Sequence, residues 1–400
     1  MRGFLPSRLR AHVLPALFAG VAGLVLAQGV PSPALGQSLL AADGLGLPVE
    51  PLDARARALG SVGVGLTGAH LLGRDPAAGA LAAISTAAVT FQSSSAALTD
   101  GAATRHTRFP AISASYPYAG NVFAVYLDSF LDQEFEIRSE EMLLLGGRSV
   151  GAQHRFTSTG SIGRASLGWS RAVREVFAIG VTVGTYVGVT ERRFSLLLDT
   201  EDVGIGVEPF ETGSRLRASG LVAGAGASWN PGPLVRVSGA LSWSDALVLS
   251  PSTDERSEEG VYRIPLEFRL GGTANLLTGL SVHAGLSYAD WTDAGADLRA
   301  GETREAAWSY GGGIEWAGTS LFGRAFPLRF GARQRALPFK SAGAEASEFV
   351  LTGGFGLNLV DAGDQPLARL ELGYERGQRT AGPIQEDVSL LAVTVRVASG

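Results

Sequence analysis

The chain has 400 residues, 54 glycines and no cysteine, and its formal net charge is −5 with a positive mean hydropathy. Without cysteine it has no disulfide framework, no thiolate metal site and no cysteine nucleophile. A single lysine, Lys340, and the lack of a basic patch exclude a nucleic-acid-binding protein. Long segments of helical period are absent, and the apolar residues alternate evenly, which favours one large all-β unit over two soluble domains.

The N-terminus has the pattern of a secretion signal. Three arginines form a basic region, and an apolar run of signal-peptide length follows them from Val13 to Ala27. Small residues allow cleavage after Ala27 or after Gly36, so residues 1–36 are predicted to be a signal peptide. The alternative is an uncleaved anchor, but the run is shorter than the about 20 residues that a spanning helix needs.

Residues 37–78 lack strand alternation. Ala54 to Gly60 predicts a short helix, and the glycines that follow, Gly63, Gly65 and Gly68, predict a coil. This stretch ends in Asp75-Pro76-Ala77, after which the strand patterns begin. Residues 79–400 are therefore predicted to form a separate β unit.

Fourteen segments of this unit alternate between apolar and polar residues, which is the period of a β-strand. They lie near residues 82–94, 107–117, 121–130, 161–171, 176–197, 215–229, 234–249, 261–273, 278–291, 306–317, 326–337, 347–360, 366–378 and 387–398. Tight turns alternate with longer polar loops, such as residues 131–160 and 199–214. Short turns on one side and long loops on the other are typical of a transmembrane antiparallel β-barrel of the outer membrane, with both termini in the periplasm.

The polar faces of these strands carry arginine and glutamate, as at Glu267 and Arg269 or at Arg329 and Arg333. An arginine that faces lipid at mid-bilayer costs about 2–4 kcal/mol, so these side chains are predicted to point into the lumen. Five of the six tryptophans fall near predicted strand ends, which is typical of an interfacial girdle. They are Trp169, Trp229, Trp291, Trp308 and Trp316.

The motifs that suggest other chemistry are weak. Gly63 to Gly68 fits G-x-G-x-x-G but follows no strand and has no acidic residue at the spacing of a ribose ligand. Ser149 fits a nucleophile-elbow pattern without its strand and helix. The histidines are scattered, and Asp290, Asp293 and Asp297 lack the other residues of a calcium loop, so neither metal nor cofactor is predicted.

The predicted lumen charges allow two interpretations. Opposite charges on neighbouring strands can pair and stiffen the barrel, which is the simpler interpretation. Alternatively, some of the arginines, Arg329 and Arg333 among them, bind an anionic head group or the N-terminal segment.

Three patches of sequence resemble the FadL-type outer-membrane transporters of long-chain fatty acids and aromatic hydrocarbons. The first is Tyr262-Arg263-Ile264-Pro265 with the hairpin that closes on Asp290-Trp291-Thr292. The second runs from Gly313-Ile314-Glu315-Trp316 through Pro327-Leu328-Arg329 to Pro338. The third is the glycine-rich stretch before Asp75-Pro76-Ala77, which is similar to a plug with an N-P-A tripeptide. Asp75 and Trp316 depart from the family's asparagine and tyrosine.

The resemblance implies a 14-stranded barrel with residues 37–78 as a plug inside the lumen. It also implies capture of a hydrophobic small molecule outside, a pocket near the plug, and an exit into the bilayer through the barrel wall. The external capture residues are then predicted in the segment after Phe130, at Phe135, Ile137, Met142, Leu143 and Leu144. In the other interpretation, this segment only packs onto the barrel rim.

The predicted function is passive transport by a monomer that contacts membrane lipid and has no enzyme activity. Two alternatives stay open. One is a FadL-like barrel that serves as a scaffold or shuttle for secreted proteins. The other is a lipid-acting barrel enzyme that uses Ser149 and His154.

Overall fold

A computed structural model describes residues 45–60, 63–68, 70–98, 103–145, 148–174, 176–198, 210–252, 260–292, 306–341, 343–362 and 365–399. All of these residues belong to one compact unit. The predicted signal peptide and Asp293 and Asp297 lie outside the described residues. We refer to residues 45–84, as far as they are described, as the N-terminal segment.

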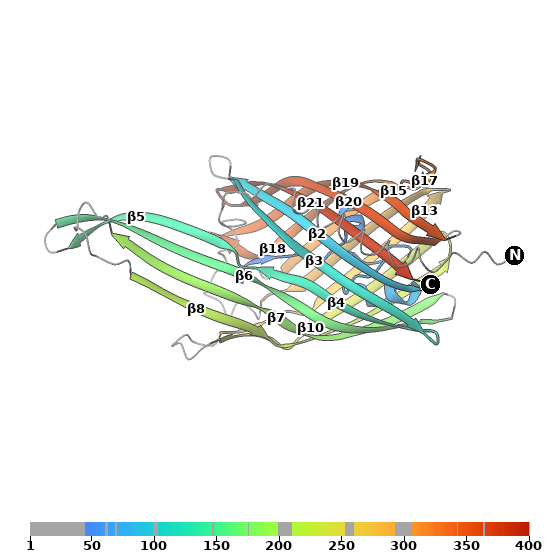
Figure 1. The fold of residues 1–400 in the computed structure, drawn as a ribbon, viewed down its shortest axis with the longest axis horizontal. Coiled ribbons are helices and arrows are strands. Elements are labelled where there is room, and N and C mark those ends of the chain that lie inside the picture. The colour runs from blue at the N-terminus through green and yellow to red at the C-terminus, as the bar shows by residue number, and fades with distance from the viewer. Residues whose placement is uncertain are drawn as a thin grey trace, which may run out of the picture. The chain divides into compact units, whose positions relative to one another are not determined.

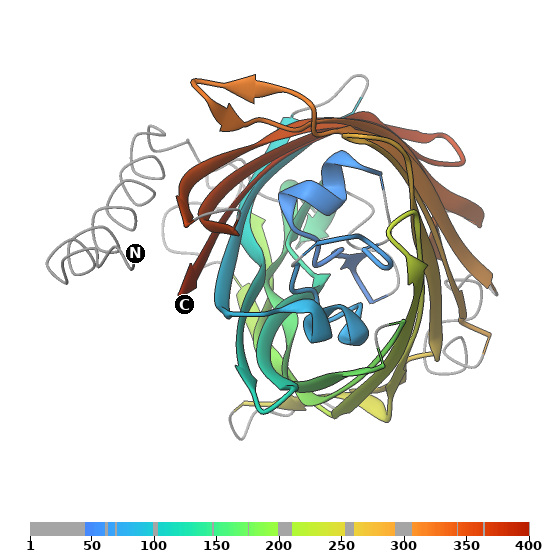
Figure 2. The same cartoon turned by 90° about the vertical axis from the view of Figure 1, so that its right-hand side faces the viewer.

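The described strands form a closed antiparallel barrel, as the sequence predicted (Figures 1 and 2). Fourteen strands follow one another around its wall, and the last pairs with the first. They are β2 (Ser85–Leu98), β3 (Ala103–Tyr118), β4 (Asn121–Asp132), β6 (Arg148–Val173), β7 (Phe177–Leu198), β9 (Leu221–Gly232), β10 (Val235–Ser244), β13 (Glu267–Leu277), β14 (Leu280–Asp290), β15 (Ala306–Trp316), β18 (Leu328–Ser341), β19 (Ala344–Ala362), β20 (Gln365–Ala381) and β21 (Ile384–Ser399).

Three predicted strands are each broken in two at about the same level of the wall. The pieces on the side of the long loops are β8 (Phe210–Ser219), β11 (Ala246–Pro251) and β12 (Gly260–Arg263). Gly220 separates β8 from β9 at a φ of +138°, where a side chain is strained. Asp245 separates β10 from β11, and residues 264–266, which include a proline that donates no ladder hydrogen bond, separate β12 from β13.

These breaks invert two of the strand faces. On β13 the apolar residues Phe268 and Leu270 face outward, as predicted, but Tyr262 of β12 packs against an interior cluster to which Ile264, just after β12, belongs. A period-two pattern changes face after any one-residue slip, and the irregular residues 264–266 supply that slip. The prediction of one uninterrupted strand over residues 261–273 is therefore wrong.

A four-stranded sheet, which we call the extension sheet, continues the wall beyond the end of β4 (Figure 1). It consists of β5 (Phe135–Leu145), the first half of β6, the second half of β7, and β8. The prediction that residues 131–160 form a polar loop is wrong, because β5 and the first half of β6 lie in this range. The alternation of Phe135 and Ile137 with Glu136 and Arg138 already indicates a strand. At about 3.4 Å per residue, the thirteen residues of β6 that precede Ser161 extend the sheet by roughly 40 Å.

The remaining wall follows the predicted pattern of charges inside and apolar side chains outside. Arg329 and Arg333 are buried, whereas Val181, Val183 and Phe330 are exposed on the outer surface. Trp229, Trp308 and Trp316 are also exposed there. Trp291 is not part of this girdle, because it is buried in the interior cluster with Ile264.

The N-terminal segment lies inside the ring of strands (Figure 2). It contains β1 (Leu47–Pro48), which pairs with the end of β4, the predicted short helix, which is α2 (Ala54–Ala58), and a 3-10 helix, η2 (Pro76–Leu81). A small hairpin of β16 (Ser320–Leu321) and β17 (Arg324–Ala325) joins β15 to β18. In the described part of the chain, no helix is long and apolar enough to span a bilayer.

Candidate functional site: the lumen above the N-terminal segment

Helix α2 holds the N-terminal segment against the barrel wall. Asp53 caps the helix by accepting a hydrogen bond from the Ala56 amide at 2.8 Å. Arg55 then donates two hydrogen bonds to Glu315 on β15, both at 2.9 Å. Arg57 pairs with Glu375 on β20 at 3.2 Å, so the two arginines of the helix reach different strands.

Opposing effects act on the pKa values of these two arginines. Burial lowers the pKa of a guanidinium because it penalises the charged form. At Arg55, the ion pair with Glu315 outweighs burial, and the pKa is raised above its ordinary value. At Arg57, burial prevails over Glu375 and, aided by Arg333, lowers the pKa. Arg55 is therefore the better stabilised of the two charges.

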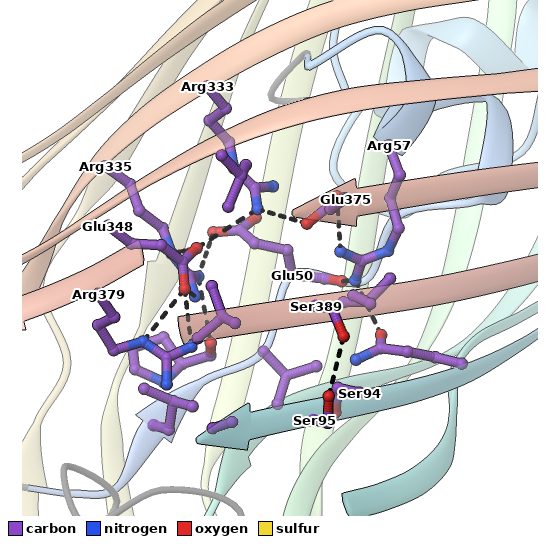
Figure 3. A pocket seen from close by; sticks show the side chains of 18 of the residues that line it. Glu50, Arg57, Ser94, Ser95, Arg333, Arg335, Glu348, Glu375, Arg379 and Ser389 are labelled. Carbon is purple, nitrogen blue, oxygen red and sulfur yellow. Dashed lines mark hydrogen bonds and ion pairs between the residues drawn. The ribbon is translucent and has the colours of Figure 1, made fainter. Parts of the chain in front are cut away.

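The glutamates that bind Arg55 and Arg57 also pair with arginines of the barrel wall, so each ion pair is part of a larger network. Arg329 bridges Glu315, at 2.6 Å, and Glu371. Figure 3 shows the second network, in which Glu348 and Glu375 lie among three arginines of β18 and β20, Arg333, Arg335 and Arg379. Arg333 is 3.0 Å from Glu375, and Arg379 is 2.7 Å from Glu348. Buried charges need such partners, and here the partners come from neighbouring strands.

These networks bear on the predicted ligand-binding role of Arg329 and Arg333. Both guanidinium groups are buried and paired with glutamates. A cavity of about 70 Å³ adjoins the second network, with five arginines and three glutamates in its lining. Two of these arginines, Arg108 and Arg379, pair with further acids outside the lining, Asp132 and Glu386. The charges therefore balance, which favours the interpretation that they stiffen the barrel.

Glycines let the N-terminal segment touch the wall backbone. A Cβ atom on Gly311 of β15 would lie 1.6 Å from the Gly60 oxygen, and one on Gly271 of β13 would lie 2.2 Å from the Val64 oxygen. The three predicted plug glycines have φ values of +77°, +78° and +80°. These are Gly63, Gly65 and Gly68. Their coil follows a path that other residues rarely adopt.

The Asp75-Pro76-Ala77 turn fixes the far end of the segment. One Asp75 carboxylate oxygen accepts a hydrogen bond from the Gly65 amide at 2.9 Å, which links the turn to the glycine coil. Pro76 begins η2 and lies against Gly180 of β7. A Cβ atom on Gly180 would be 2.1 Å from the Pro76 backbone oxygen. Burial raises the pKa of Asp75, although Arg236 on β10 and the Gly65 amide oppose this effect.

We call the ion pairs between the N-terminal segment and the wall, with the two networks that continue them, the charged layer. Apolar side chains fill the lumen on the side of this layer that faces the extension sheet, which we call the mouth of the barrel. The first mouth cluster gathers buried residues from seven strands, from two residues outside the strands (Ile264 and Trp291) and from the N-terminal segment: Leu45, Leu131, Ile162, Tyr186, Leu216, Ala218, Val222, Leu247, Leu249, Ile264, Ala289 and Trp291. The second mouth cluster consists of Leu47, Phe135, Leu337, Phe339, Ala346 and Ala381, with Phe156 and Ile384 packed against it. The inverted face of β11 supplies Leu247 and Leu249 of the first cluster, and Tyr262 of β12 packs against it.

A cavity of about 130 Å³ lies between the mouth clusters and the N-terminal segment. Its floor includes Pro48 to Pro51 and Arg74 of the segment. Phe130, Trp291 and Leu337 contribute apolar surface, whereas Asp128, Arg164, Glu267 and Arg269 contribute charge. Arg74 pairs with Glu50 and, at 3.0 Å, with Glu267. Arg164 lies over the Phe130 ring at 3.8 Å, which is a cation–π contact.

The same cavity reaches the wall where the ladder is interrupted. Pairing of β10 with β13 ends at Ser242 and Glu267, and pairing of β11 with β12 resumes at Ala246. Ser242, Trp243 and Glu267 all line the cavity. Trp243 is also exposed on the outer surface. The cavity thus borders the wall at the point where the ladder is interrupted.

The extension sheet places the predicted capture residues on two faces. Phe135, Ile137 and Leu143 share the inner face, which is the face that continues the lumen side of β6 and β7. Met142 and Leu144 are exposed on the outer face. The prediction missed Phe194 and Phe210, which lie on the inner face, although each alternates with polar neighbours.

The inner and outer faces of this sheet differ in chemistry. Ile137, Phe156 and Phe194 are directly opposed across three strands of the inner face. On the outer face, Glu136 pairs with Arg155 at 2.9 Å. The inner face thus carries an apolar row across three strands, with polar side chains such as His154 and Arg192 beside it, and the outer face carries the Glu136–Arg155 ion pair.

The residues proposed for an enzyme are not brought together. Ser149 is on the outer face of β6, and His154 is on the inner face, where its ring lies 2.9 Å from Glu141. Ser149 also lies in a strand rather than in a turn before a helix. Among the described residues, no group of three or more histidines and acids is arranged to hold a metal ion.

Comparison with solved structures supports the fold. No family model matches the sequence, and no curated protein matches it. The toluene transporter TbuX of Ralstonia pickettii is similar over 88% of this chain and 99% of its own, with a TM-score of 0.57 and 13% identity. A FadL homologue of Pseudomonas aeruginosa has the same coverage and identity and a TM-score of 0.58.

The toluene transporter TodX of Pseudomonas putida is also similar, with a TM-score of 0.54, 14% identity, and coverage of 88% of this chain and 98% of its own. Identities this low show a shared fold and nothing more about chemistry. The predicted FadL-type fold is thereby confirmed. The chain has the barrel architecture that is found in these transporters.

Proposed function

We propose that this protein is a passive outer-membrane channel for compact hydrophobic molecules. The observation that carries the proposal is the continuous apolar path from the inner face of the extension sheet, through the mouth clusters, to the cavity of about 130 Å³. The similar structures include transporters of toluene, which agrees with a cargo of this kind. Both termini then face the periplasm, and the barrel acts as a monomer in contact with lipid.

The inner face of the extension sheet is the capture surface in this proposal. A hydrophobic molecule gains free energy by leaving water for Ile137, Phe156 and Phe194, at about 25 cal/mol per Å² of apolar surface buried. Because these side chains continue into the second mouth cluster through Phe135 and Phe156, the molecule reaches the barrel without returning to water. Met142 and Leu144, on the other face, would contribute nothing to this path.

The cavity favours a small and uncharged cargo. An engineered apolar protein cavity of about 150 Å³ holds one benzene molecule, so the cavity here matches one aromatic ring rather than a long acyl chain. The three acids of its lining, Glu50, Asp128 and Glu267, offset the arginines Arg74, Arg164 and Arg269, and the fourth arginine, Arg335, pairs with Glu348 at 2.7 Å. No surplus positive charge is left among them for an anionic head group.

The N-terminal segment serves as the plug, and the cargo leaves through the wall. The part of the segment that is fixed by Arg55 and Arg57 lies below the cavity, so it blocks a straight path along the lumen. The interrupted ladder beside Trp243 offers a way into the bilayer. An apolar cargo gains nothing from entering the water below the plug, which makes this lateral exit the favourable one.

Two neighbouring residues of β6 test the capture surface. Phe156→Asp places a carboxylate on the inner face, whereas Thr157→Asp places it on the outer face of the same strand. Cells that depend on this protein for toluene uptake are expected to lose about tenfold or more of the rate with Phe156→Asp, because an uncompensated charge interrupts the apolar path. Thr157→Asp is expected to leave the rate unchanged. Equal rates for both variants and the parent protein would overturn the proposal.

A hydrophobic acid is a second candidate cargo, because of Arg192. This arginine is on the inner face directly opposite Ser158, and no carboxylate of the described residues pairs with it. The hydroxyl oxygens of Ser158 and Thr190, both buried, also have no hydrogen-bond partner among the described residues. If the cargo is an acid, Arg192→Gln lowers uptake of a carboxylate-bearing hydrophobe but not of toluene. Equal effects on the two would exclude this candidate.

A further inference from the structure

The β16–β17 hairpin stands apart from the wall that it connects. It joins β15 to β18 at the end of the barrel where the short turns and the C-terminus lie (Figure 1). The view along the barrel shows it outside the ring of strands and directed sideways (Figure 2). A turn that only joined two neighbouring strands would not need to leave the ring, so this hairpin has a different role.

Contacts at its base hold the hairpin on the outer wall. The Phe326 ring packs on Phe355 of β19 at a centroid distance of 5.0 Å. Arg324 donates hydrogen bonds to the backbone oxygens of Asn358, at 3.2 Å, and Leu359. The Phe326 amide donates to the Thr319 oxygen at 3.0 Å, which closes the base. The hairpin is therefore fixed over the outward face of β19.

Its tip is apolar and strained. Phe322 is 92% exposed, the highest value among the large apolar side chains of the described residues. Its φ of +53° is in the left-handed region, which costs a bulky residue on the order of 1–3 kcal/mol. Water would add an unfavourable contact with the ring to this backbone cost. An apolar environment around the tip removes the contact of the ring with water, although the backbone cost stays.

The neighbouring rim has the composition of a membrane interface. Leu276, Leu277 and Trp316 are all exposed, and Leu280 lies opposite both Leu277 and Trp316 in the ladders. Tryptophan prefers the boundary between head groups and acyl chains. The exposed Arg324 adds a positive charge at this rim, which suits lipid phosphates, while one of its nitrogens donates hydrogen bonds to the β19 carbonyl oxygens.

We infer that the hairpin inserts Phe322 into the lipid leaflet at the short-turn end of the barrel and anchors the barrel there. The partner is the boundary between the head groups and the acyl chains of that leaflet. This inference rests on the membrane location in the proposed function but not on its cargo or its plug. The sideways direction of the hairpin keeps its tip beside the wall, where that leaflet lies.

The absence of cysteine makes the test specific. Phe322→Cys is labelled with an environment-sensitive fluorophore in the full chain, reconstituted in vesicles of phosphatidylethanolamine and phosphatidylglycerol. Leu351→Cys, on the outward face of β19, is the lipid control, and Ala119→Cys, in the β3–β4 turn at the same end, is the water control. Quenching by lipids with a nitroxide near the head group and by aqueous iodide is measured for each label.

The label at residue 322 is expected to be quenched by the nitroxide lipids and protected from iodide at least severalfold better than the label at residue 119. If it is quenched by iodide as strongly as the label at residue 119, the inference is overturned. A label at residue 351 that iodide also reaches would overturn the membrane location itself. The two failures are therefore distinguishable.

Discussion

Around the N-terminal segment the lumen wall is charged, whereas at the mouth the same wall turns apolar. Below, Arg55 and Arg57 meet glutamates of β15 and β20, and each charge has a specific partner. Above, Leu247 and Ile264 pack into a cluster that has no directional bonds of this kind. The difference arises from the slips at Asp245 and at residues 264–266, which turn the apolar faces of β11 and β12 inward.

The two regions are expected to respond differently to change. Ion pairs fix one geometry, since removing either partner leaves a buried charge. Apolar contacts are less directional, so a cluster can open around a small molecule and close again. The charged layer is thus suited to hold the N-terminal segment, and the mouth is suited to let a hydrophobic molecule pass.

Glu315→Gln should have the largest effect. Arg55 and Arg329 both pair with this carboxylate, and losing it from a buried network costs roughly 3–5 kcal/mol. The N-terminal segment should then leave the wall more often. Single-channel conductance in planar bilayers is expected to rise, and the denaturation midpoint is expected to fall.

A matched control is Glu136→Gln on the outer face of the extension sheet. Glu136 pairs with Arg138 and Arg155, whose side chains are exposed, so its loss should cost at most about 1 kcal/mol. Conductance that rises equally in both variants would mean that the buried network does not hold the segment.

Leu247→Ala tests the mouth. This fully buried side chain is in the first mouth cluster, and shortening a buried leucine to alanine costs about 2–5 kcal/mol. Leu241→Ala on the lipid-facing side of β10 serves as the control. Thermal unfolding should begin at a lower temperature in the first variant only. Ion conductance should stay low, because the N-terminal segment is untouched; a rise like that of Glu315→Gln would contradict the separation of the two layers.

Gly311→Ala tests the close contact between wall and segment. Its added Cβ would collide with the Gly60 oxygen, and overpacking of this kind costs about 1–3 kcal/mol. Gly239→Ala is a suitable control because the nearest atom to its Cβ would be 3.8 Å away. More rapid proteolysis of the N-terminal segment in the first variant, but not in the second, is the expected result.

Much of the barrel could be predicted from the sequence because its pattern is local. Alternating residues, such as those around Arg329, reveal both the strand and the direction of each side chain. The inversion at β12 could not be predicted in this way. An apolar residue such as Tyr262 looks the same whether it faces lipid or a mouth cluster, so only the three-dimensional path of the chain decides.

The site was harder to predict for a second reason. Glu315 is 260 residues from Arg55, and nothing in a single sequence says which of the many lumen acids an arginine will meet. Phe135 and Ile137 of the proposed capture surface could be predicted from the sequence, because they are apolar residues in the segment that follows Phe130. Met142 and Leu144 lie on the opposite face from these two residues. This could not be predicted, because residues 135–145 were interpreted as a loop rather than as the strand β5.

The smallest expected effect is a dependence of the N-terminal segment on pH. His70 is buried in it, and burial, followed by the charges of Arg236 and Arg55, lowers its pKa well below the ordinary 6.5. Well above pH 6.5 the residue is neutral whether the segment is docked or free. Below that value a free segment binds a proton and a docked one does not, so docking loses stability as the pH falls. Asp75 opposes this trend, because its raised pKa favours the docked state once its carboxyl is protonated.

Asp75→Asn removes the opposing titration, while the amide oxygen can still accept the hydrogen bond from Gly65. Conductance of this variant is expected to rise between about pH 7.5 and about pH 5, which is the range where an exposed histidine gains its proton. A second variant that also carries His70→Gln should show a flat profile. A rise that persists without His70 would place the pH response elsewhere, whereas a rise that disappears would show that protonation of His70 releases the N-terminal segment from the wall.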